Sequence, residues 1–295
     1  MRDYLLAVVM GIVEGLTEFL PVSSTAHLRI VQAVVGIDLG NAYWKTFSVV
    51  IQLGAIVCLP VYFWQRIAGL LRGFPRGVSG DRTVVTHPLT LTLVAFVVTA
   101  IPAFLLSKVI GKHLESLTVM ALSLLVGGVV MWIVDARYER ARRRASTHGR
   151  LTDTIDQMSL PQAVWIGACQ VLAAVFPGTS RSMATITAGE LAGMSRAAAL
   201  EFSFFLSIPT MAAATIYDLW KSLRPAGPDA SALGAMPGDA HSWIVLVIGF
   251  VVSFVVAYGV VAWFMTWVRR HGFAPFAIYR IVLGIAVLWW AGRTP

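Results

Sequence analysis

Long runs of apolar residues, separated by short polar segments, dominate the chain. Six of these runs are about long enough to cross the hydrocarbon core of a bilayer, which takes ~20 apolar residues as α-helix. They lie at 44–64, 89–110, 117–135, 200–217, 243–268 and 274–292. Two further apolar segments, at 4–22 and 161–177, are shorter and are interrupted by polar residues. The pattern predicts an all-α, polytopic membrane protein with six transmembrane helices.

Composition and charge agree with this interpretation. Hydrophobic residues make up 57% of the 295 residues and charged residues only 13%, whereas an ordinary soluble domain carries about 25% charged residues. A net charge of +8 would suggest nucleic acid as a partner in a soluble protein. Here the basic residues lie in short loops between apolar runs. We therefore interpret the charge as a topology signal, and we expect membrane lipids and no nucleic acid as partners.

Neither the cysteines nor the N-terminus changes this picture. Cys58 and Cys169 each lie inside an apolar segment without metal-ligand spacing, so we expect packing roles rather than a disulfide. Arg2 and the apolar run after it imitate a signal peptide. Glu14 and Glu18 interrupt that run, however, and no small-residue cleavage pattern follows. We expect this segment to remain in the mature protein.

An internal repeat is visible when residues 11–27 (GIVEGLTEFLPVSSTAH) are compared with residues 167–183 (GACQVLAAVFPGTSRSM). The same shift of 156 residues continues along the chain. It aligns Gly11 with Gly167, Glu14 with Gln170, Pro21 with Pro177, Ser24 with Ser180, Ala121 with Ala277 and Gly128 with Gly284. Each match is weak alone, but the constant shift predicts a duplication, with repeats at 1–145 and 160–295 in a single membrane domain, 1–295.

Each repeat consists of a broken segment followed by three apolar runs. If the segments 4–36 and 161–196 are re-entrant helical hairpins, each repeat crosses the membrane three times, and the second repeat is inverted. Such a fold places its site near the midplane, where the broken helices meet. A fold in which both hairpins cross fully remains an alternative.

The distribution of basic residues is consistent with inverted repeats. In the six-span arrangement, the arginine-rich loops 65–88 and 136–160, together with Arg269 and Arg270, fall on one face, which should be cytoplasmic. The opposite face receives Lys108, Lys112, Lys221, Arg224 and the loop 225–240. We therefore predict a bacterial inner-membrane protein in which a basic cytoplasmic loop joins the two repeats.

Several ionisable residues lie in or beside apolar segments, where a charge costs at least ~2.5–3.5 kcal/mol. They are Glu14, Glu18, His27, Arg181, Glu190, Arg196, Glu201 and Arg280. For Glu190, Arg196, Glu201 and Arg280, a structural ion pair is as good an explanation as a functional role. One example would be a pair between Glu201 and Arg280. The functional interpretation is stronger for the residues of the hairpins.

In the first hairpin, Glu14 and Glu18 are four residues apart and share one helix face. Two such carboxylates are tolerable beside a divalent cation, or if one is protonated. A second helix starts after Pro21, with Ser23, Ser24 or Thr25 as its N-cap. Its N-terminus would bind an anion.

The second hairpin repeats this construction at Pro177. Gly178 would let the backbone approach a ligand closely, and Arg181 supplies a planar fork that suits phosphate oxygens. Capping alone is an adequate explanation for Ser23 and Thr179, but less so for Ser24 and Ser180. Together the hairpins predict a site for a phosphorylated group and a cation.

At these residues the sequence resembles the undecaprenyl-diphosphate phosphatase family, the bacitracin-resistance membrane phosphatases. The resemblance runs essentially end to end. It is carried by EGLTEFLPVSSTAH at 14–27, KTFSVVIQLGAI at 45–56, PGTSRSMAT at 177–185, EFSFFLSIP at 201–209 and PFAIYR at 275–280. It implies hydrolysis of undecaprenyl diphosphate to the monophosphate and phosphate, which recycles the lipid carrier for cell-wall synthesis and confers bacitracin resistance.

The resemblance also implies interlocked inverted repeats, dependence on a divalent cation and an active site open to the periplasm. On this basis Glu14 and Glu18 are expected to bind Mg²⁺ or Ca²⁺, or one of them is expected to act as a base. Ser24 is the expected nucleophile, with His27 near enough to move its proton. Arg181 is expected to hold the diphosphate. The expected anion-binding residues are Ser23, Thr25, Gly178, Thr179, Ser180, Ser182 and Thr185.

Two mechanisms and two classes of function remain open from the sequence. Water could attack directly, activated by Glu18 or His27, with Ser24 only orienting the phosphate. A transporter or flippase of a prenyl phosphate lipid would use the same fold. A phosphatidic-acid-type phosphatase needs a histidine nucleophile and a second histidine in a separate motif. This class is excluded, because no histidine follows Arg181 until His241. The sequence leaves the oligomeric state open and is compatible with a homodimer.

Overall fold

The computed structural model describes residues 1–38, 40–77, 80–106, 116–145, 151–222 and 239–292. These residues form eleven α-helices and a short 3₁₀ turn, and no β-strand occurs among them. The helices are α1 (Arg2–Thr17), α2 (Ser24–Val34), α3 (Ala42–Tyr62), α4 (Trp64–Gly73), α5 (Pro88–Leu105), α7 (Leu117–Ala145), α8 (Leu160–Val175), α9 (Arg181–Leu191), α10 (Arg196–Ser222), α11 (Ala240–Trp267) and α12 (Ala274–Ala291). The all-α prediction is confirmed.

Six helices are long and apolar enough to cross a membrane, as the hydrophobic pattern predicts. They are α3, α5, α7, α10, α11 and α12. Two predicted boundaries differ. Helix α7 continues 10 residues past 135, because the arginines and alanines that follow are good helix formers. The predicted loop 65–88 contains α4, whose apolar and polar residues alternate with helical period.

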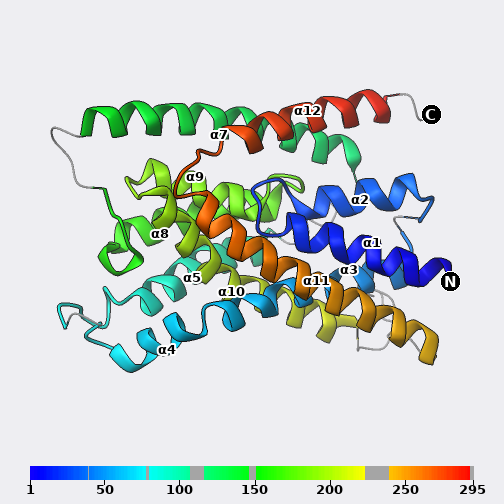
Figure 1. Ribbon diagram of the computed structural model, residues 1–295, viewed down its shortest axis with the longest axis horizontal. Helices are drawn as coiled ribbons and strands as arrows, with labels where there is room; N and C mark the ends of the chain where they lie inside the picture. Colours follow the sequence, from blue (N-terminus) through cyan, green and yellow to red (C-terminus); the bar gives the residue numbers. More distant parts are fainter. Residues whose placement is uncertain (39, 78–79, 107–115, 146–150, 223–238, 293–295) are drawn as a thin grey trace.

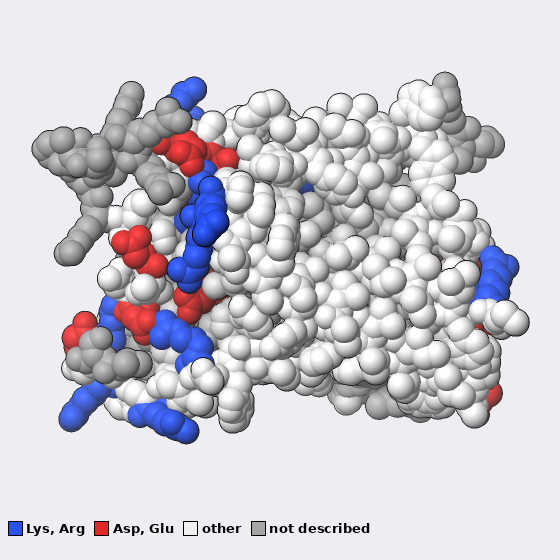
Figure 2. Space-filling model, in the orientation of Figure 1, with Lys and Arg blue, Asp and Glu red and all other residues white. Residues whose placement is uncertain are grey.

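Most of the charged side chains on the face in Figure 2 gather at one end of the molecule, a few lie at the opposite end, and the surface between them is uncharged. Arg66, on α4, binds both Asp156 and Glu201 at this end. The predicted pairing of Glu201 with Arg280 is therefore wrong, since Glu201 has a nearer partner on α4. The basic residues predicted for the opposite face, Lys108, Lys112 and Arg224, with the side chain of Lys221 and the loop 225–238, lie outside the described residues.

A second ionic cluster lies where α7, α9 and α10 approach one another. Arg196 contacts Asp135 at 2.5 Å, Glu139 at 2.6 Å and Glu190 at 3.3 Å. Its guanidinium also lies 4.7 Å from the centre of the Tyr138 ring. Structural pairing, the alternative kept for Glu190 and Arg196, accounts for both residues.

Two helical hairpins lie at the centre of the molecule (Figure 1). We call α1, residues 18–23 and α2 the first hairpin, and α8, residues 176–180 and α9 the second hairpin. The first packs through α1 on α11, and the second packs through α8 on α5. Glycine makes both contacts close. A Cβ at Gly11 would lie 2.8 Å from the carbonyl oxygen of Gly249, and one at Gly167 would lie 2.5 Å from that of Ala95.

The hydrophobic core surrounds the break of the first hairpin. Phe19 is fully buried there and meets the ring of Phe204 edge-on, with centroids 5.4 Å apart. Cys58 is buried in the same core, Cys169 packs against it, and both are free thiols. The packing roles predicted for the cysteines are confirmed.

Candidate active site

Each hairpin break ends in a serine with an unusual backbone conformation. Ser23 has φ of 74° and Ser180 has φ of 71°, and they are the only non-glycine residues with positive φ in the described parts of the chain. Such a conformation costs about 1–3 kcal/mol and must be held by its surroundings. Ser23 accepts a hydrogen bond from Ala26 N–H, and Ser180 accepts one from Met183 N–H. Both serines are N-caps, so the capping explanation also covers Ser180.

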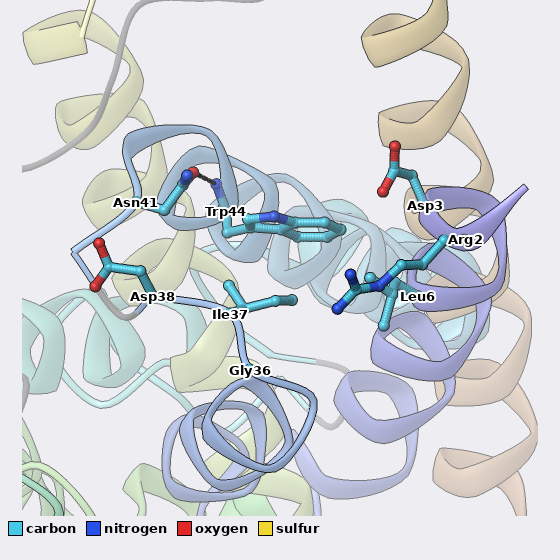
Figure 3. A pocket seen from close by; sticks show the side chains of 8 residues that line it. All are labelled: Arg2, Asp3, Leu6, Gly36, Ile37, Asp38, Asn41 and Trp44. Atoms are coloured by element: carbon cyan, nitrogen blue, oxygen red, sulfur yellow. Dashed lines mark hydrogen bonds between the residues drawn. The ribbon is translucent and has the colours of Figure 1, made fainter.

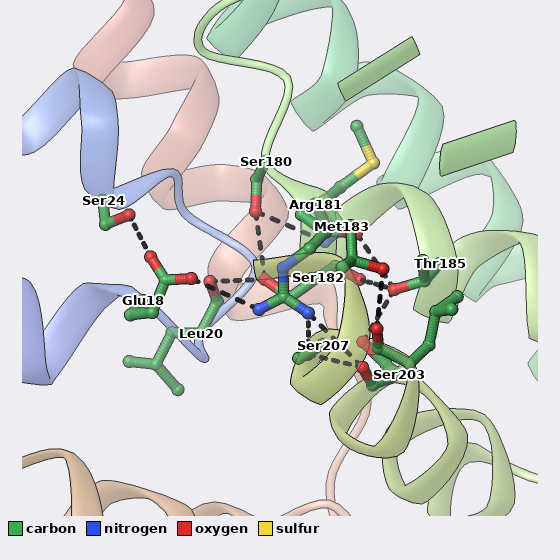
Figure 4. Close-up of polar contacts among 12 residues, drawn as sticks. Glu18, Leu20, Ser24, Ser180, Arg181, Ser182, Met183, Thr185, Ser203 and Ser207 are labelled. Atoms are coloured by element: carbon green, nitrogen blue, oxygen red, sulfur yellow. Dashed lines mark hydrogen bonds and ion pairs between the residues drawn. The ribbon is translucent and has the colours of Figure 1, made fainter. Parts of the chain in front are cut away.

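Glu18 connects the two hairpins. It is nearly fully buried, and its Oε2 accepts a 2.5 Å hydrogen bond from the hydroxyl of Ser24. Its other oxygen forms a 3.3 Å ion pair with Nη2 of Arg181 (Figure 4). A serine hydroxyl, a carboxylate and a guanidinium therefore form one continuous chain across the two breaks. In this chain Glu18 is placed to take the serine proton.

Helix α10 supports Arg181 from the other side. Nη1 of Arg181 donates to the carbonyl of Ser203 at 3.3 Å and to the hydroxyl of Ser207. Its Nε–H is buried and has no partner among the described residues. Because a buried polar group normally has a partner, this N–H is a free donor for an anion.

Two further hydroxyls of the second hairpin serve the protein's own backbone. Ser182 donates to the carbonyl of Leu20, in the first break, at 2.9 Å, and also lies 3.0 Å from the hydroxyl of Ser180. Thr185 donates to backbone carbonyls within α9 and meets the hydroxyl of Ser203 at 2.7 Å. Ser182 therefore links the two hairpins, and Thr185 links α9 to α10.

Both ring nitrogens of His27 have partners other than Ser24. Its Nδ1 lies 2.7 Å from the carbonyl oxygen of Ser23, and its Nε2 lies 2.6 Å from the hydroxyl of Tyr279. A carbonyl only accepts, so Nδ1 carries a proton, and in the neutral ring Nε2 accepts from the tyrosine. The predicted proton relay from Ser24 to His27 is not formed. The sequence spacing was compatible with it, but Glu18 is the partner of Ser24.

Glu14 is the first candidate ligand for the expected cation. Its side chain is fully buried, no donor among the described residues reaches its carboxylate oxygens, and the carboxyl group of Glu18 lies beside it. Glu14 lies one helical turn before Glu18. The described residues contain no cluster of three or more acidic, histidine or cysteine side chains that could hold a metal ion. Two carboxylates fit Mg²⁺, which keeps several waters and takes further oxygens from substrate phosphates.

The remaining predicted anion ligands have other surroundings. Thr25 is exposed and Thr179 is half-buried. Gly178 has φ of 94°, and a Cβ there would lie 2.5 Å from the carbonyl oxygen of Met120. Close packing against α7, rather than approach to a ligand, therefore explains why this position is glycine.

Four residues at the site have no role assigned from the sequence. Ser203 and Ser207 hold Arg181, while Tyr279 binds His27, and Arg280 bonds to both breaks. A signal was present. Serines four apart in an apolar run share one helix face and must point to a polar partner.

A separate surface pocket of about 230 Å³ opens beside the N-terminus (Figure 3). It is lined by Arg2, Asp3, Leu6, Gly36, Ile37, Asp38, Asn41 and Trp44. The first of these lies at the start of α1 and Glu18 at its end, about 24 Å apart along a helix. This pocket is therefore not part of the candidate site.

Taken together, the fold and the site define a multi-pass helical membrane protein with a buried polar site built from two broken hairpins. The chain belongs to the BacA family. It matches the family described as "Bacitracin resistance protein BacA" over residues 7–286.

Three similar proteins share a name. A protein of Koribacter versatilis (strain Ellin345), "Undecaprenyl-diphosphatase", is 65% identical over 291 residues, which cover 99% of each chain. A protein of Sorangium cellulosum (strain So ce56) with the same name is 43% identical over 96% of this chain and 85% of its own. A third, from Rhizobium johnstonii (strain DSM 114642 / LMG 32736 / 3841), is 39% identical over 97% of this chain and 96% of its own.

Proposed function

We propose that this protein is an undecaprenyl-diphosphate phosphatase, which hydrolyses the terminal phosphate from the lipid carrier and returns undecaprenyl phosphate to cell-wall synthesis. The observation that carries the proposal is the chain formed by Ser24, Glu18 and Arg181 across the two breaks. Simple anion binding would need the guanidinium but not a serine hydroxyl oriented onto a buried carboxylate. The shared name of the relatives supports the same reaction. Removal of the diphosphate is also the basis of the bacitracin resistance that we expect.

In the mechanism that fits this geometry, the oxygen of Ser24 attacks the terminal phosphorus while Glu18 accepts its proton. The bond from that phosphorus to the bridging oxygen breaks, and undecaprenyl phosphate leaves. Water then hydrolyses the phosphoserine, which releases phosphate and restores the hydroxyl. The free Nε–H of Arg181 stabilises charge on the transferring group.

Direct attack by water is the competing mechanism. Glu18 would then take a proton from water, and Ser24 would only orient the phosphate. The 2.5 Å bond between Ser24 and Glu18 favours the first mechanism, because it already aligns the proton with its acceptor.

The expected divalent cation, Mg²⁺ or Ca²⁺, would be held by Glu14 and Glu18. When bound, such a cation polarises phosphoryl oxygens and offsets their charge. The buried carboxylate of Glu14, which no donor among the described residues reaches, is the feature that supports this site. Of the two carboxylates, that of Glu14 accepts no hydrogen bond from the described residues, so it would be the principal ligand.

We further propose that the two hairpins are re-entrant and that the repeats 1–145 and 160–295 are inverted in one membrane domain. Crosswise packing supports this arrangement, because α1 lies on α11 and α8 lies on α5. The end that carries Arg66 and Arg196 would face the cytoplasm of a bacterial inner membrane. The active site would then open to the periplasm. A homodimer stays a prediction.

The decisive test is phosphate release from a prenyl diphosphate by detergent-purified protein, with and without EDTA. We expect metal-dependent turnover in the wild type and its collapse in Arg181→Ala and Glu18→Ala. Transport has no meaning in detergent, so well-folded wild type without turnover would favour the transporter or flippase. Rapid quench with substrate labelled in the terminal phosphate separates the two mechanisms, since only the first places the label on Ser24.

A further inference from the structure

Arg280 is the largest fully buried side chain described in this protein. Its guanidinium donates to three backbone carbonyls. Nη1 reaches Pro21 in the first break, and Nη2 reaches Gly178 in the second break and Ser123 on α7, each at 3.1 Å. One side chain on α12 therefore ties together the two breaks and the helix beside them.

The charge of Arg280 has no counter-ion among the residues that the structure describes, because all three partners are neutral carbonyls. Burying a cation without a carboxylate is costly, and proteins seldom retain such an arrangement without a use for the charge. Arg181 differs, since Glu18 pairs with it. With formal charges, Glu14, Glu18 and Arg181 leave the cation-free site at −1, and Arg280 brings it to zero. Its charge makes the site more favourable for a diphosphate, with or without the expected cation.

Helix α7 is shaped to receive this side chain. A Cβ at Gly127 would lie 2.4 Å from Nη2 of Arg280 and 2.6 Å from Cε of Met183, so both side-chain ends would have to move. Gly284 lies on the same pair of helices but away from the guanidinium, where a Cβ would meet the carbonyl of Ala121 at 2.9 Å. A side chain at Gly127 would thus displace the ends of Arg280 and Met183, whereas one at Gly284 would press mainly on the backbone of α7 and leave Arg280 untouched.

We propose that Arg280 is a positioning residue of the active site, which holds the two hairpin breaks in register and supplies positive charge behind the substrate phosphate. The inference rests on the proposed function and deepens it. Arg181 contacts the phosphate, whereas Arg280 acts from behind the backbone, through the carbonyls of Pro21 and Gly178. Its two contributions, charge and geometry, can be separated by substitution.

The experiment compares wild type, Arg280→Met and Arg280→Lys at saturating divalent cation, and measures kcat, KM and inhibition by inorganic phosphate. Arg280→Met removes the charge, so we expect KM and the phosphate inhibition constant to rise about tenfold or more. Arg280→Lys keeps the charge but loses the fork. We expect Arg280→Lys to have a KM close to that of the wild type and a kcat at least about tenfold below the wild-type value. A folded Arg280→Met protein with wild-type KM and phosphate inhibition would overturn the proposal.

If Arg280→Met does not fold, alanine substitutions at Gly127 and Gly284 provide a second comparison. Gly127→Ala displaces the guanidinium, together with the end of Met183, without removing charge, and we expect a lower kcat than in Gly284→Ala at equal thermal stability. Equal kcat in the two glycine variants would show that Arg280 is only structural. Stabilisation of the fold by inorganic phosphate adds a readout that needs no turnover. Wild type without turnover refutes the proposed function, whereas wild-type turnover with unaltered Arg280 variants refutes this inference alone.

Discussion

The two hairpins share a construction but carry different chemistry. Each has a helix, a break with an N-cap serine at positive φ, and a second helix. The first hairpin brings carboxylates and a serine hydroxyl, whereas the second brings Arg181. Position 14 and its repeat partner at 170 illustrate the difference. No donor in the described structure reaches the carboxylate of Glu14, but the side-chain amide of Gln170 donates to Thr99 and Thr210.

This difference teaches how a duplicated scaffold can divide one task. The first hairpin is equipped for a cation and a proton, and the second for an anion. The chemistry depends on the few contacts that cross between them, chiefly Glu18 to Arg181 and Ser182 to Leu20. Substitutions that exchange or uncouple the hairpins test this division.

The largest effect is expected from the ion pair between the hairpins. Arg181→Ala should lower kcat/KM by about 10²–10³-fold, the usual loss for a donor to a transition-state anion. Arg181→Lys should recover little, because the paired geometry needs the fork. Steady-state phosphate release gives the numbers. Arg66→Ala is the matched control, an ion-paired arginine outside both breaks, and an equal loss there would contradict the assignment.

Next in size is the coupling within the first hairpin. Ser24→Ala and Glu18→Gln should each lower kcat/KM by at least about 10²-fold, and the double variant should be little worse than either, because the two groups act as a unit. A double-mutant cycle measures this. Additive losses would separate the two residues and favour direct attack by water.

Exchanging residues between the hairpins should have a moderate effect. Glu14→Gln gives the first hairpin the residue of the second, and we expect the Mg²⁺ concentration for half-maximal activity to rise at least about tenfold. Gln170→Glu is the reverse exchange. It should leave the metal requirement unchanged and lower thermal stability, because it buries a carboxyl group beside Thr99 and Thr210. A changed metal requirement in Gln170→Glu would count against the division of roles.

The smallest effect concerns the helices that support the hairpins. His87 caps α5, beneath the second hairpin, and its Nδ1 accepts from Leu89 N–H. Burial lowers the pKa of His87 in the folded protein from the usual 6.5. The neutral imidazole cap therefore stabilises the fold fully above pH 6.5, and this stabilisation is lost as the pH falls through the lowered pKa of the folded state. Asp239 caps α11, beneath the first hairpin, and the Ser242 N–H lowers its pKa. That cap persists to below pH 3.8.

Thermal unfolding of purified protein between pH 7 and 5 tests this asymmetry. The free energy of unfolding of the wild type should fall by about 1 kcal/mol over this pH range, which is the usual contribution of an N-cap. His87→Asn should remove the pH dependence, because asparagine caps without titrating in this range. Asp239→Asn is the control and should keep the wild-type slope. An unchanged slope in His87→Asn would assign the acid sensitivity to another group.

The six spans could be predicted from sequence because run length and hydropathy are local properties. The partners of individual charged and polar residues could not. Arg280 bonds to carbonyls of Pro21 and Gly178, 259 and 102 residues away, and a carbonyl has no sequence signature. Glu201 likewise found Arg66 on α4, a helix that the loop prediction had missed.

Within the site, the residues were predicted better than their contacts. Spacing correctly placed Glu14 and Glu18 one helical turn apart and Ser24 at the start of the next helix, although Glu18 is the C-cap of α1 rather than a residue inside it. It could not distinguish Glu18 from His27 as the partner of Ser24, because both lie within reach. Tyr279, on a helix near the other end of the chain, binds the His27 ring, so Glu18 is the partner that remains for Ser24.

The glycine contact between α1 and α11 also has a consequence for biogenesis. Gly11 is among the first residues made, but its partner Gly249 is synthesised 238 residues later. At about 5–20 residues per second, ribosomes need roughly 10–50 s to reach it. During that interval the first hairpin can pack on α3 but lacks α11, the helix that α1 contacts most extensively, and its two carboxylates stay in or near the bilayer. Assembly of the catalytic centre is thus among the last events in the life of the nascent chain.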